Sequence, residues 1–167
     1  MKKNIPCGNI KRHLFFCWLI LMAVLLFMTN HALSEVKRCK GQTVYVPIYS
    51  HIYSGDRERA FLLAATLSIR NTDPDQSITV TAVDYYDSDG RLLKKHIQQH
   101  LTLNPMASTR IVIKESDKSG GSGANFIVKW ESKHRVIEPL IESIMIGTQV
   151  QQGISFTSRG QVVMEID

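Results

Sequence analysis

Cysteine is nearly absent from the part of this sequence that follows its first 34 residues. The 167-residue chain has three cysteines, and two of them, Cys7 and Cys17, lie within those first residues. Cys39 is therefore alone in the remainder, which excludes an internal disulfide there. We interpret Cys39 as an incidental residue close to a frayed terminus, with a free thiol and an intermolecular bridge as the alternatives.

An excess of charge is also missing once the N-terminal part is set aside. The whole chain carries 20 basic and 15 acidic residues, a net charge of +5. Residues 1–34 contain four of the basic residues and none of the acidic ones. That leaves 16 basic and 15 acidic residues, a net charge of +1, for residues 35–167. So small a charge provides no basic surface for nucleic acid, so no nucleic-acid partner is expected.

Charge is absent altogether from residues 14–28, which are all apolar. This run follows four basic residues and precedes Ala32 and Ser34, small residues at the −3 and −1 positions of a cleavage site. The order is that of a secretory signal peptide, and the run is shorter than the roughly 20 residues of a transmembrane helix. We predict a signal peptide over residues 1–34, cleaved after Ser34, and an exported protein of the periplasm or cell envelope. The alternative is an uncleaved N-terminal anchor, the one case in which a membrane contact is expected.

Alternation of β-branched or aromatic residues with polar ones recurs after the N-terminal part. Strands are predicted at residues 43–49, 60–70, 78–86, 108–113, 126–130 and 153–157, with 162–164 as an extension of the last. Residues 91–103 and 137–148 fit either a strand or a helix, and we prefer the extended reading for the first. About seven to nine short strands separated by turns indicate an all-β fold. We predict a short linker over residues 35–42 and a single immunoglobulin-like β-sandwich over residues 43–167.

Three finer expectations follow from local chemistry. Pro47 has no amide to donate, which predicts that residues 43–49 form an edge strand. Turn residues near Pro74 and Gly90 predict that residues 64–95 form a meander of three strands. The predicted core residues of this meander are Leu67, Ile69, Ile78, Val80 and Val83.

The stretch expected to be most flexible is rich in serine and glycine. Its run Gly-Gly-Ser-Gly-Ala nearly matches a nucleophile elbow, but that elbow needs a strand before it and a helix after it. Here a polar loop precedes the run and a strand follows, so a serine hydrolase is excluded. We interpret the stretch as a mobile hairpin loop and as the leading binding site, with residues 51–59 and 149–153 as further binding loops. Its residues are Lys118, Ser119, Gly120, Gly121, Ser122 and Gly123.

Two histidines suggest the main alternative function, which is metal binding. His96 and His100 are four residues apart and share a face, so with Cys39 they could bind zinc or copper. The aspartates near Gly90 lack calcium-loop spacing, because Tyr85 and His96 stand where acidic residues are required. We therefore expect no cofactor in the leading interpretation. The alternative is a periplasmic metal or small-ligand carrier.

Six sequence blocks occur in a fixed order across residues 41–160. They are GQTVYVPIYSHIYSGDR, LAATLSIRNTDP, VDYYDSDGRL, NPMAST, ESDKSGGSGANFIVKW and GTQVQQGISFTSRG. Together they resemble the bacterial family known as domain of unknown function 3124. The resemblance implies a small exported envelope protein and implies no reaction, cofactor or catalytic residue. Since no acid–base or nucleophile–base pair emerges from the residues either, we predict a non-catalytic envelope domain, not an enzyme, that binds a protein or another surface component.

Overall fold

The computed structural model describes residues 13, 15–20, 22, 36–148 and 153–166. The chain divides into two units, Met1–Glu35 and Val36–Asp167. In the first unit the described residues are helical, and no helix among the described residues is long and apolar enough to cross a membrane. Ser34 and most of residues 1–34 lie outside the described residues, so the signal peptide and its cleavage stay predictions.

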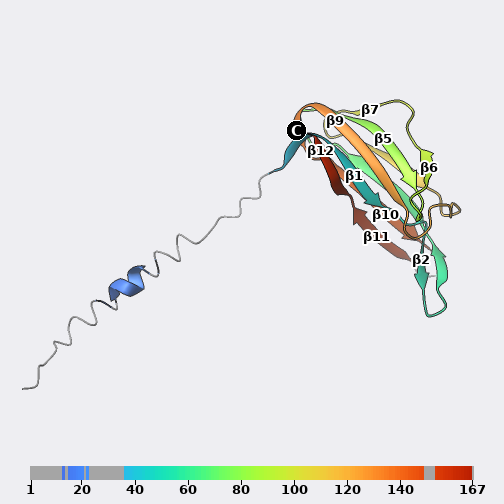
Figure 1. Ribbon diagram of the computed structural model, residues 1–167, viewed down its shortest axis with the longest axis horizontal. Helices are drawn as coiled ribbons and strands as arrows, with labels where there is room; N and C mark the ends of the chain where they lie inside the picture. The colour runs from blue at the N-terminus through green and yellow to red at the C-terminus, as the bar shows by residue number, and fades with distance from the viewer. Residues whose placement is uncertain (1–12, 14, 21, 23–35, 149–152, 167) are drawn as a thin grey trace, which may run out of the picture. The chain divides into compact units, whose positions relative to one another are not determined.

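The second unit is an all-β sandwich of two antiparallel sheets with a small ribbon (Figure 1). The described residues form twelve strands: β1 (Arg38–Pro47), β2 (His51–Ser54), β3 (Arg59–Leu62), β4 (Ala64–Arg70), β5 (Ile78–Tyr86), β6 (Leu92–Lys95), β7 (Leu101–Leu103), β8 (Ser108–Ile113), β9 (Asn125–Ile137), β10 (Leu140–Gly147), β11 (Ile154–Arg159) and β12 (Gln161–Ile166). The predicted fold class is confirmed. The structure has more strands than the expected seven to nine because it includes four very short ones. These are β2, β3, β6 and β7, each of three or four residues.

Strand order defines the two layers. The six-stranded sheet runs β12-β1-β9-β5-β6, with β7 also paired to β5. The four-stranded sheet runs β11-β10-β4-β8, and β2 pairs with β3 as a separate ribbon. β9 is the longest strand and pairs with both β1 and β5, so it forms the centre of the larger sheet.

The core lies between the inner faces of the two sheets. All five predicted core residues are buried, with at most 1% of each side chain exposed. A register shift between Val80 and Ala82 explains why Val83 joins Val80 on the inner face. Such a β-bulge adds one residue to a strand and reverses the side to which the following side chains point. Simple alternation of the two faces along residues 78–86 therefore stops at Val80.

The position and the length of β1 show that two further predictions are wrong. The strand lies between β12 and β9, so the edge-strand prediction for residues 43–49 is wrong. β12 reaches only as far as Tyr45, and Pro47 faces β9 alone, so its missing amide costs no bond to β12. β1 also begins at Arg38, inside the predicted linker, and Cys39 is completely buried beside Val136 of β9. Cys39 is thus a core residue and not part of a frayed terminus, and burial raises the pKa of its thiol.

The turn after β4 crosses from one sheet to the other, so the predicted three-strand meander is wrong. β4 belongs to the four-stranded sheet, whereas β5 and β6 belong to the six-stranded sheet. Asn71 and Asp73 are buried in this crossing and satisfy its main-chain groups. The Asn71 side-chain amide donates to the carbonyls of Gln76, Leu103 and Asn104. A crossing turn inside the protein needs such partners, because a buried unpaired main-chain group is costly.

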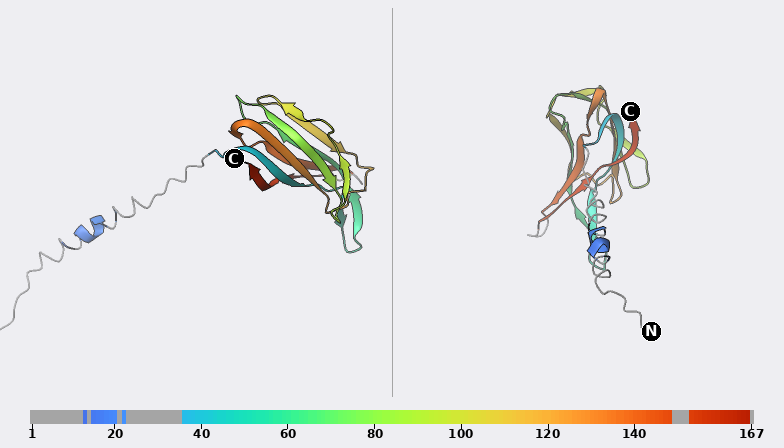
Figure 2. Two further views of the ribbon diagram at one scale, coloured as in Figure 1. Left: turned by 45° about the horizontal axis from the view of Figure 1, so that its top comes forward. Right: turned by 90° about the vertical axis from the view of Figure 1, so that its left-hand side faces the viewer.

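A second crossing occurs at Gly160, between β11 and β12. Its amide donates to the carbonyl of Ile141, and a Cβ at this position would lie 2.6 Å from Cγ1 of Val44. Glycine therefore allows the chain to pass closely over the core and change sheets. As a result β11 and β12, coloured brown and red in Figures 1 and 2, are edge strands of different sheets that follow one another along one side of the sandwich.

Candidate functional site

The Ser/Gly loop, residues 118–123, connects β8 of one sheet to β9 of the other, so it is a crossover and not the predicted hairpin. Two serines from other loops hold it. Ser50 Oγ accepts a hydrogen bond from the Gly121 amide at 3.0 Å and donates to the Gly121 carbonyl at 3.1 Å. Ser88 Oγ accepts from the Gly123 amide at 2.9 Å. The amides of Gly121 and Gly123 and the carbonyl of Gly121 are thus bound by side chains of the protein itself, so Ser50 and Ser88 anchor the loop.

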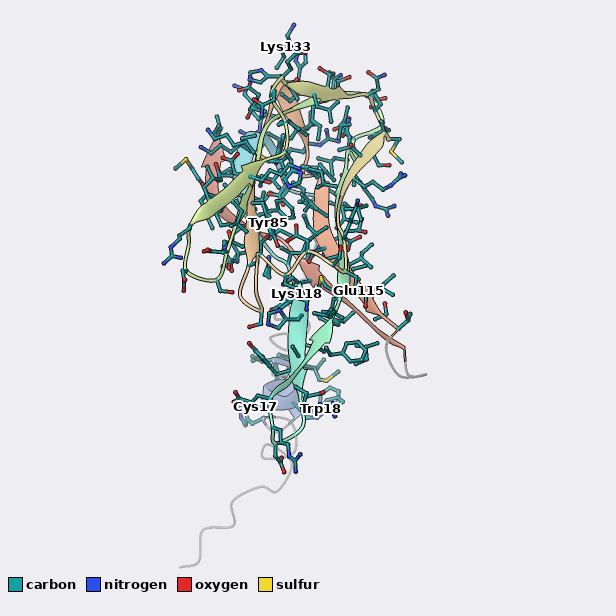
Figure 3. The ribbon with its side chains drawn as sticks, turned by 90° about the vertical axis from the view of Figure 1, so that its right-hand side faces the viewer. Cys17, Trp18, Tyr85, Glu115, Lys118 and Lys133 are labelled. Carbon is teal, nitrogen blue, oxygen red and sulfur yellow. The ribbon has the colours of Figure 1, made fainter. Side chains whose placement is uncertain are left out.

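An aromatic cluster lies beneath this loop. The rings of Tyr85 and Phe126 stack at 4.9 Å between centroids, and the His96 ring meets Phe126 edge-on at 5.5 Å. Gly120 packs directly on Tyr85, since a Cβ there would lie 1.9 Å from the tyrosine hydroxyl. Tyr85 Oη and His96 Nε2 are buried and have no hydrogen-bond partner among the described residues. Figure 3 shows Tyr85 in the body of the sandwich, with Lys118 nearer to one end.

The surroundings keep the polar groups of this cluster neutral. Burial raises the pKa of Tyr85 to about 12, and the nearby charge of Asp117 acts in the same direction. Burial also lowers the pKa of His96, as does Lys94, while Asp117 opposes them. Hydrogen bonds from Ser119 lower the pKa of Asp117, so this carboxylate is the charged member of the group at neutral pH. The predicted loop and His96 thus come together here around Tyr85, which the sequence did not identify as part of a site.

The histidines and Cys39 of the predicted metal alternative are not brought together. His96 contacts Phe126, whereas Cys39 pairs with Val136, ten residues further along β9. Ten residues of strand span roughly 30 Å, which is far beyond the reach of a shared metal ion. His100 is exposed in the connection between β6 and β7. Within the described part of the chain, no group of three or more His, Cys, Asp or Glu residues is placed to hold a metal ion.

The other two predicted binding loops have different outcomes. Residues 51–59 begin with β2 and form most of the ribbon that projects beyond the sandwich in Figure 1. His51 Nε2 lies 3.2 Å from the Tyr53 hydroxyl, and Tyr53 is 56% exposed. Residues 149–152 lie outside the described residues, so nothing further bears on that loop except that Gly153 is exposed.

A groove on the outer face of the four-stranded sheet was not found from the sequence. Its volume is about 280 Å³, and we name it the arginine groove. Its lining includes Thr66, Ser68, Arg70, Ser108, Arg110 and Ile144. Thr66, Ser68 and Arg70 alternate with apolar residues in the sequence of the predicted strand at residues 60–70. The pairing of β4 with β8 that completes the groove was not visible in the sequence, because the two strands are separated by three others along the chain.

The outer edge of β12 is the second surface that the sequence did not identify. Every residue of this strand is exposed, and β12 pairs only with β1 among the described strands. Val163 is 58% exposed, Met164 63% and Ile166 49%. The sequence signal was the run of apolar residues from Val162, but it predicted only an extension of the preceding strand. That this strand lies at an edge depends on the topology of both sheets.

Comparison with known proteins places the chain in a family. The model of a family described as "Protein of unknown function (DUF3124)" matches residues 41–163. The chain belongs to this family. Membership of DUF3124 confirms the resemblance seen in the six sequence blocks, and the description of the family names no activity to transfer.

The remaining comparisons add little. No curated protein matches the chain. A solved structure described as "Crystal Structure of Thermotoga maritima 1070" is similar, with 15% sequence identity, 74% of this chain and 93% of that chain covered, and a TM-score of 0.43. A likeness at this level carries no argument about fold or function. The function of this DUF3124 member therefore has to be argued from its own surfaces.

Proposed function

We propose that this protein is a non-catalytic exported domain of the cell envelope that binds a protein partner by strand addition to β12. The observation that carries the proposal is the exposed apolar edge of this strand. Val163 and Met164 are each more than half exposed at the rim of the six-stranded sheet. Edge strands present unpaired amides and carbonyls, and an extended segment of a partner can pair with them while its side chains meet those of the edge.

β12 lacks two of the usual protections of an edge strand, although its pairing with β1 contains a register shift at Val163. Proteins commonly place lysine or proline on such strands, or distort them, to prevent unwanted pairing. β12 contains neither residue, and its charged side chain, Glu165, is engaged in an ion pair with Lys37. Lys37 also contacts Glu138 at 2.9 Å, and hydrogen bonds to both carboxylates raise the pKa of Lys37. Lys37 thus offsets one of the two carboxylates, and the three charged side chains next to the strand carry a net charge of −1.

The sequence of β12 indicates the chemistry of the partner segment. Three apolar residues, Val162 to Met164, stand between Gln161 and Glu165. In an antiparallel pair centred on Val163, a second β12 would place Val162 opposite Met164 and Gln161 opposite Glu165 once the register shift at Val163 is straightened by the pairing. Apolar residues would then face apolar ones and polar residues polar ones, which is the pairing that stabilises neighbouring strands. A second copy of this chain is therefore the partner to which we commit.

The proposed location has separate support. Residues 1–34 have the order of a secretory signal peptide, with basic residues, an apolar run and small residues at the cleavage site. An exported domain of near-neutral charge has no electrostatic barrier to self-association. Nothing in the strand-addition proposal depends on whether the N-terminal segment is cleaved.

The test replaces Val163 with lysine and Val112 with lysine as the matched control. The two valines are 58% and 54% exposed, and Val112 lies on β8, an edge strand of the other sheet. Protein purified from cells expressing the full chain is examined by light scattering and by binding of a fluorescent peptide of sequence QVVMEI. We expect Val163→Lys to weaken dimerisation or peptide binding by at least about tenfold, since a lysine at the centre of the strand pair is unfavourable.

Val112→Lys should behave like the unmodified protein in both measurements, and neither change should lower the melting temperature much because both side chains are exposed. A monomeric protein that also fails to bind the peptide would overturn the proposal. Equal losses for the two lysine variants would overturn it as well, because they would show a general effect of charge. A protein that stays monomeric but binds the peptide would retain strand addition and replace the second copy with another envelope protein.

A further inference from the structure

The arginine groove places two like charges side by side on the outer face of the four-stranded sheet. Arg110 of β8 stands directly opposite Ser68 of β4, and Arg70 is two residues beyond Ser68 on the same face. Arg70 Nε donates a hydrogen bond to Ser68 Oγ at 3.1 Å. The Arg70 guanidinium therefore bends toward Ser68, which is the residue paired with Arg110. Both arginines line the same groove, and the terminal nitrogens of Arg70 remain available.

The carboxylate of Glu142, on the neighbouring strand β10, stands next to the groove that these two arginines line. Among the described residues, neither Arg70 nor Arg110 takes part in an ion pair. Two guanidinium groups that line one groove repel each other unless an anion lies between them. Arginine is also the side chain best suited to grip phosphate, because its planar group presents several donors in a fixed fork.

The rest of the groove indicates what carries the anion. Hydroxyl groups of Thr66, Ser68 and Ser108 line it, and Ile144 adds an apolar patch at one end. Hydroxyls both donate and accept hydrogen bonds, so they suit a polyol, and the apolar patch suits the face of a carbon skeleton. A hollow of about 280 Å³ is large enough for a small phosphorylated polyol rather than for a bare ion alone.

We propose that the arginine groove binds a phosphate-bearing polyol, with Arg70 and Arg110 gripping the phosphate and the serine and threonine hydroxyls binding the polyol. This site is separate from the β12 edge and does not depend on the function proposed for it. Two other hollows on the molecule suit an anion less well. One is lined by Glu138, whose carboxylate already binds Gln42 and Lys37, and the other includes Asp75 beside Lys133.

Glu142 limits the negative charge that the ligand can carry. It pairs with Ser68 on the side of β4 opposite to Arg110, so a carboxylate stands next to the groove. Its negative charge would oppose a second anionic group on the ligand. We therefore expect a single phosphate group, and we expect Glu142→Gln to tighten binding.

The experiment uses glycerol 1-phosphate as the soluble probe, with glycerol and glycerate as controls that lack the phosphate. Binding to the full-chain protein is followed by NMR shifts of the Thr66, Ser68 and Ser108 amides. Arg70→Gln and Arg110→Gln should each weaken binding by at least about tenfold, because a charge-assisted hydrogen bond is lost. Arg57→Gln is the matched control, since Arg57 is an exposed arginine in the connection between β2 and β3.

A second arm distinguishes the source of the phosphate. Vesicles of phosphatidylglycerol in phosphatidylcholine are compared with phosphatidylcholine alone. Binding of both the vesicles and glycerol 1-phosphate, lost in the two groove variants, would assign a lipid headgroup, whereas binding of glycerol 1-phosphate alone would assign a soluble ligand. The proposal is overturned if neither probe binds, if glycerate binds as well as glycerol 1-phosphate, or if Arg57→Gln weakens binding as much as Arg70→Gln.

Discussion

Asp73 is buried at one end of the sandwich, and replacing it with asparagine tests how this end is held together. Its Oδ1 accepts hydrogen bonds from the Asp75 and Gln76 amides, each at 2.9 Å. Its Oδ2 accepts one from the Ile137 amide at 3.0 Å and faces Arg38 at 3.3 Å. Asparagine has one acceptor oxygen and one donor nitrogen, so in either orientation at least one of these amides meets a donor instead of an acceptor.

The expected loss follows from this geometry. A buried amide left without an acceptor costs about 1–3 kcal/mol. The ion pair adds at most about 1 kcal/mol, because the Arg38 side chain is 49% exposed. Asp73→Asn should therefore lower the free energy of unfolding by about 2–3 kcal/mol, or the melting temperature by about 5–10 °C. That is a large share of the roughly 5–15 kcal/mol that stabilises a domain.

Asp87→Asn is the matched control. Asp87 accepts from the Asp89 and Arg91 amides through the same single oxygen, at 2.9 and 2.8 Å, so asparagine keeps both bonds. We expect this variant to stay within about 0.5 kcal/mol of the unmodified protein in thermal and urea denaturation followed by circular dichroism. An Asp73→Asn variant as stable as Asp87→Asn would refute the reasoning.

The pH dependence of the stability provides a second test of the role of the Asp73 carboxylate. Burial acts to raise the pKa of Asp73, but hydrogen bonds from three main-chain amides and the charge of Arg38 outweigh it, so the pKa is lowered. A lowered pKa contributes stability that is complete above the unfolded value of about 4 and is lost as the pH falls through the folded value. The difference between Asp73→Asn and the unmodified protein should therefore shrink as the pH falls below about 4.

Two further outcomes are expected at the aromatic cluster under the Ser/Gly loop. Gly120→Ala should cost about 1–3 kcal/mol in thermal denaturation, because its Cβ would overlap the Tyr85 hydroxyl, whereas Gly153→Ala has open space and should cost far less. The pKa of Tyr85 is raised from 10.0 to about 12, so the unmodified protein should lose about 2 kcal/mol of stability as the pH rises across that interval. Tyr85→Phe should remove this loss and remain stable at pH 7, and an unchanged alkaline profile for this variant would contradict the assignment.

Local sequence was enough to identify most strands and the residues of the core. The extended reading of residues 91–103 is confirmed by β6 and β7, and residues 137–148 contain β10. Leu67 and Ile69 were correctly placed in the core because alternation along one strand decides which face is buried. Where a bulge interrupts the alternation, as between Val80 and Ala82, alternation alone no longer tells which face is buried.

Local sequence was not enough to say which strands are neighbours. The turn at Asn71 has ordinary turn residues, yet it crosses between sheets because its polar side chains bind groups from several distant segments. Pro47 suggested an edge strand, although it lies just past the end of the β12 pairing. In both cases the residue chemistry was right, and the partner was decided by segments far away along the chain.

The sequence by itself therefore determined the fold class, the core, the family resemblance and the expectation of export. Only the tertiary structure decided that Arg70 and Arg110 line the same groove, that β12 forms an exposed edge, and that Gly120 rests on Tyr85 beside His96. Periodicity reports which face of a strand is buried, but pairing between sheets depends on long-range packing that no short stretch of sequence contains. Both proposed surfaces of this DUF3124 member arise from such pairing.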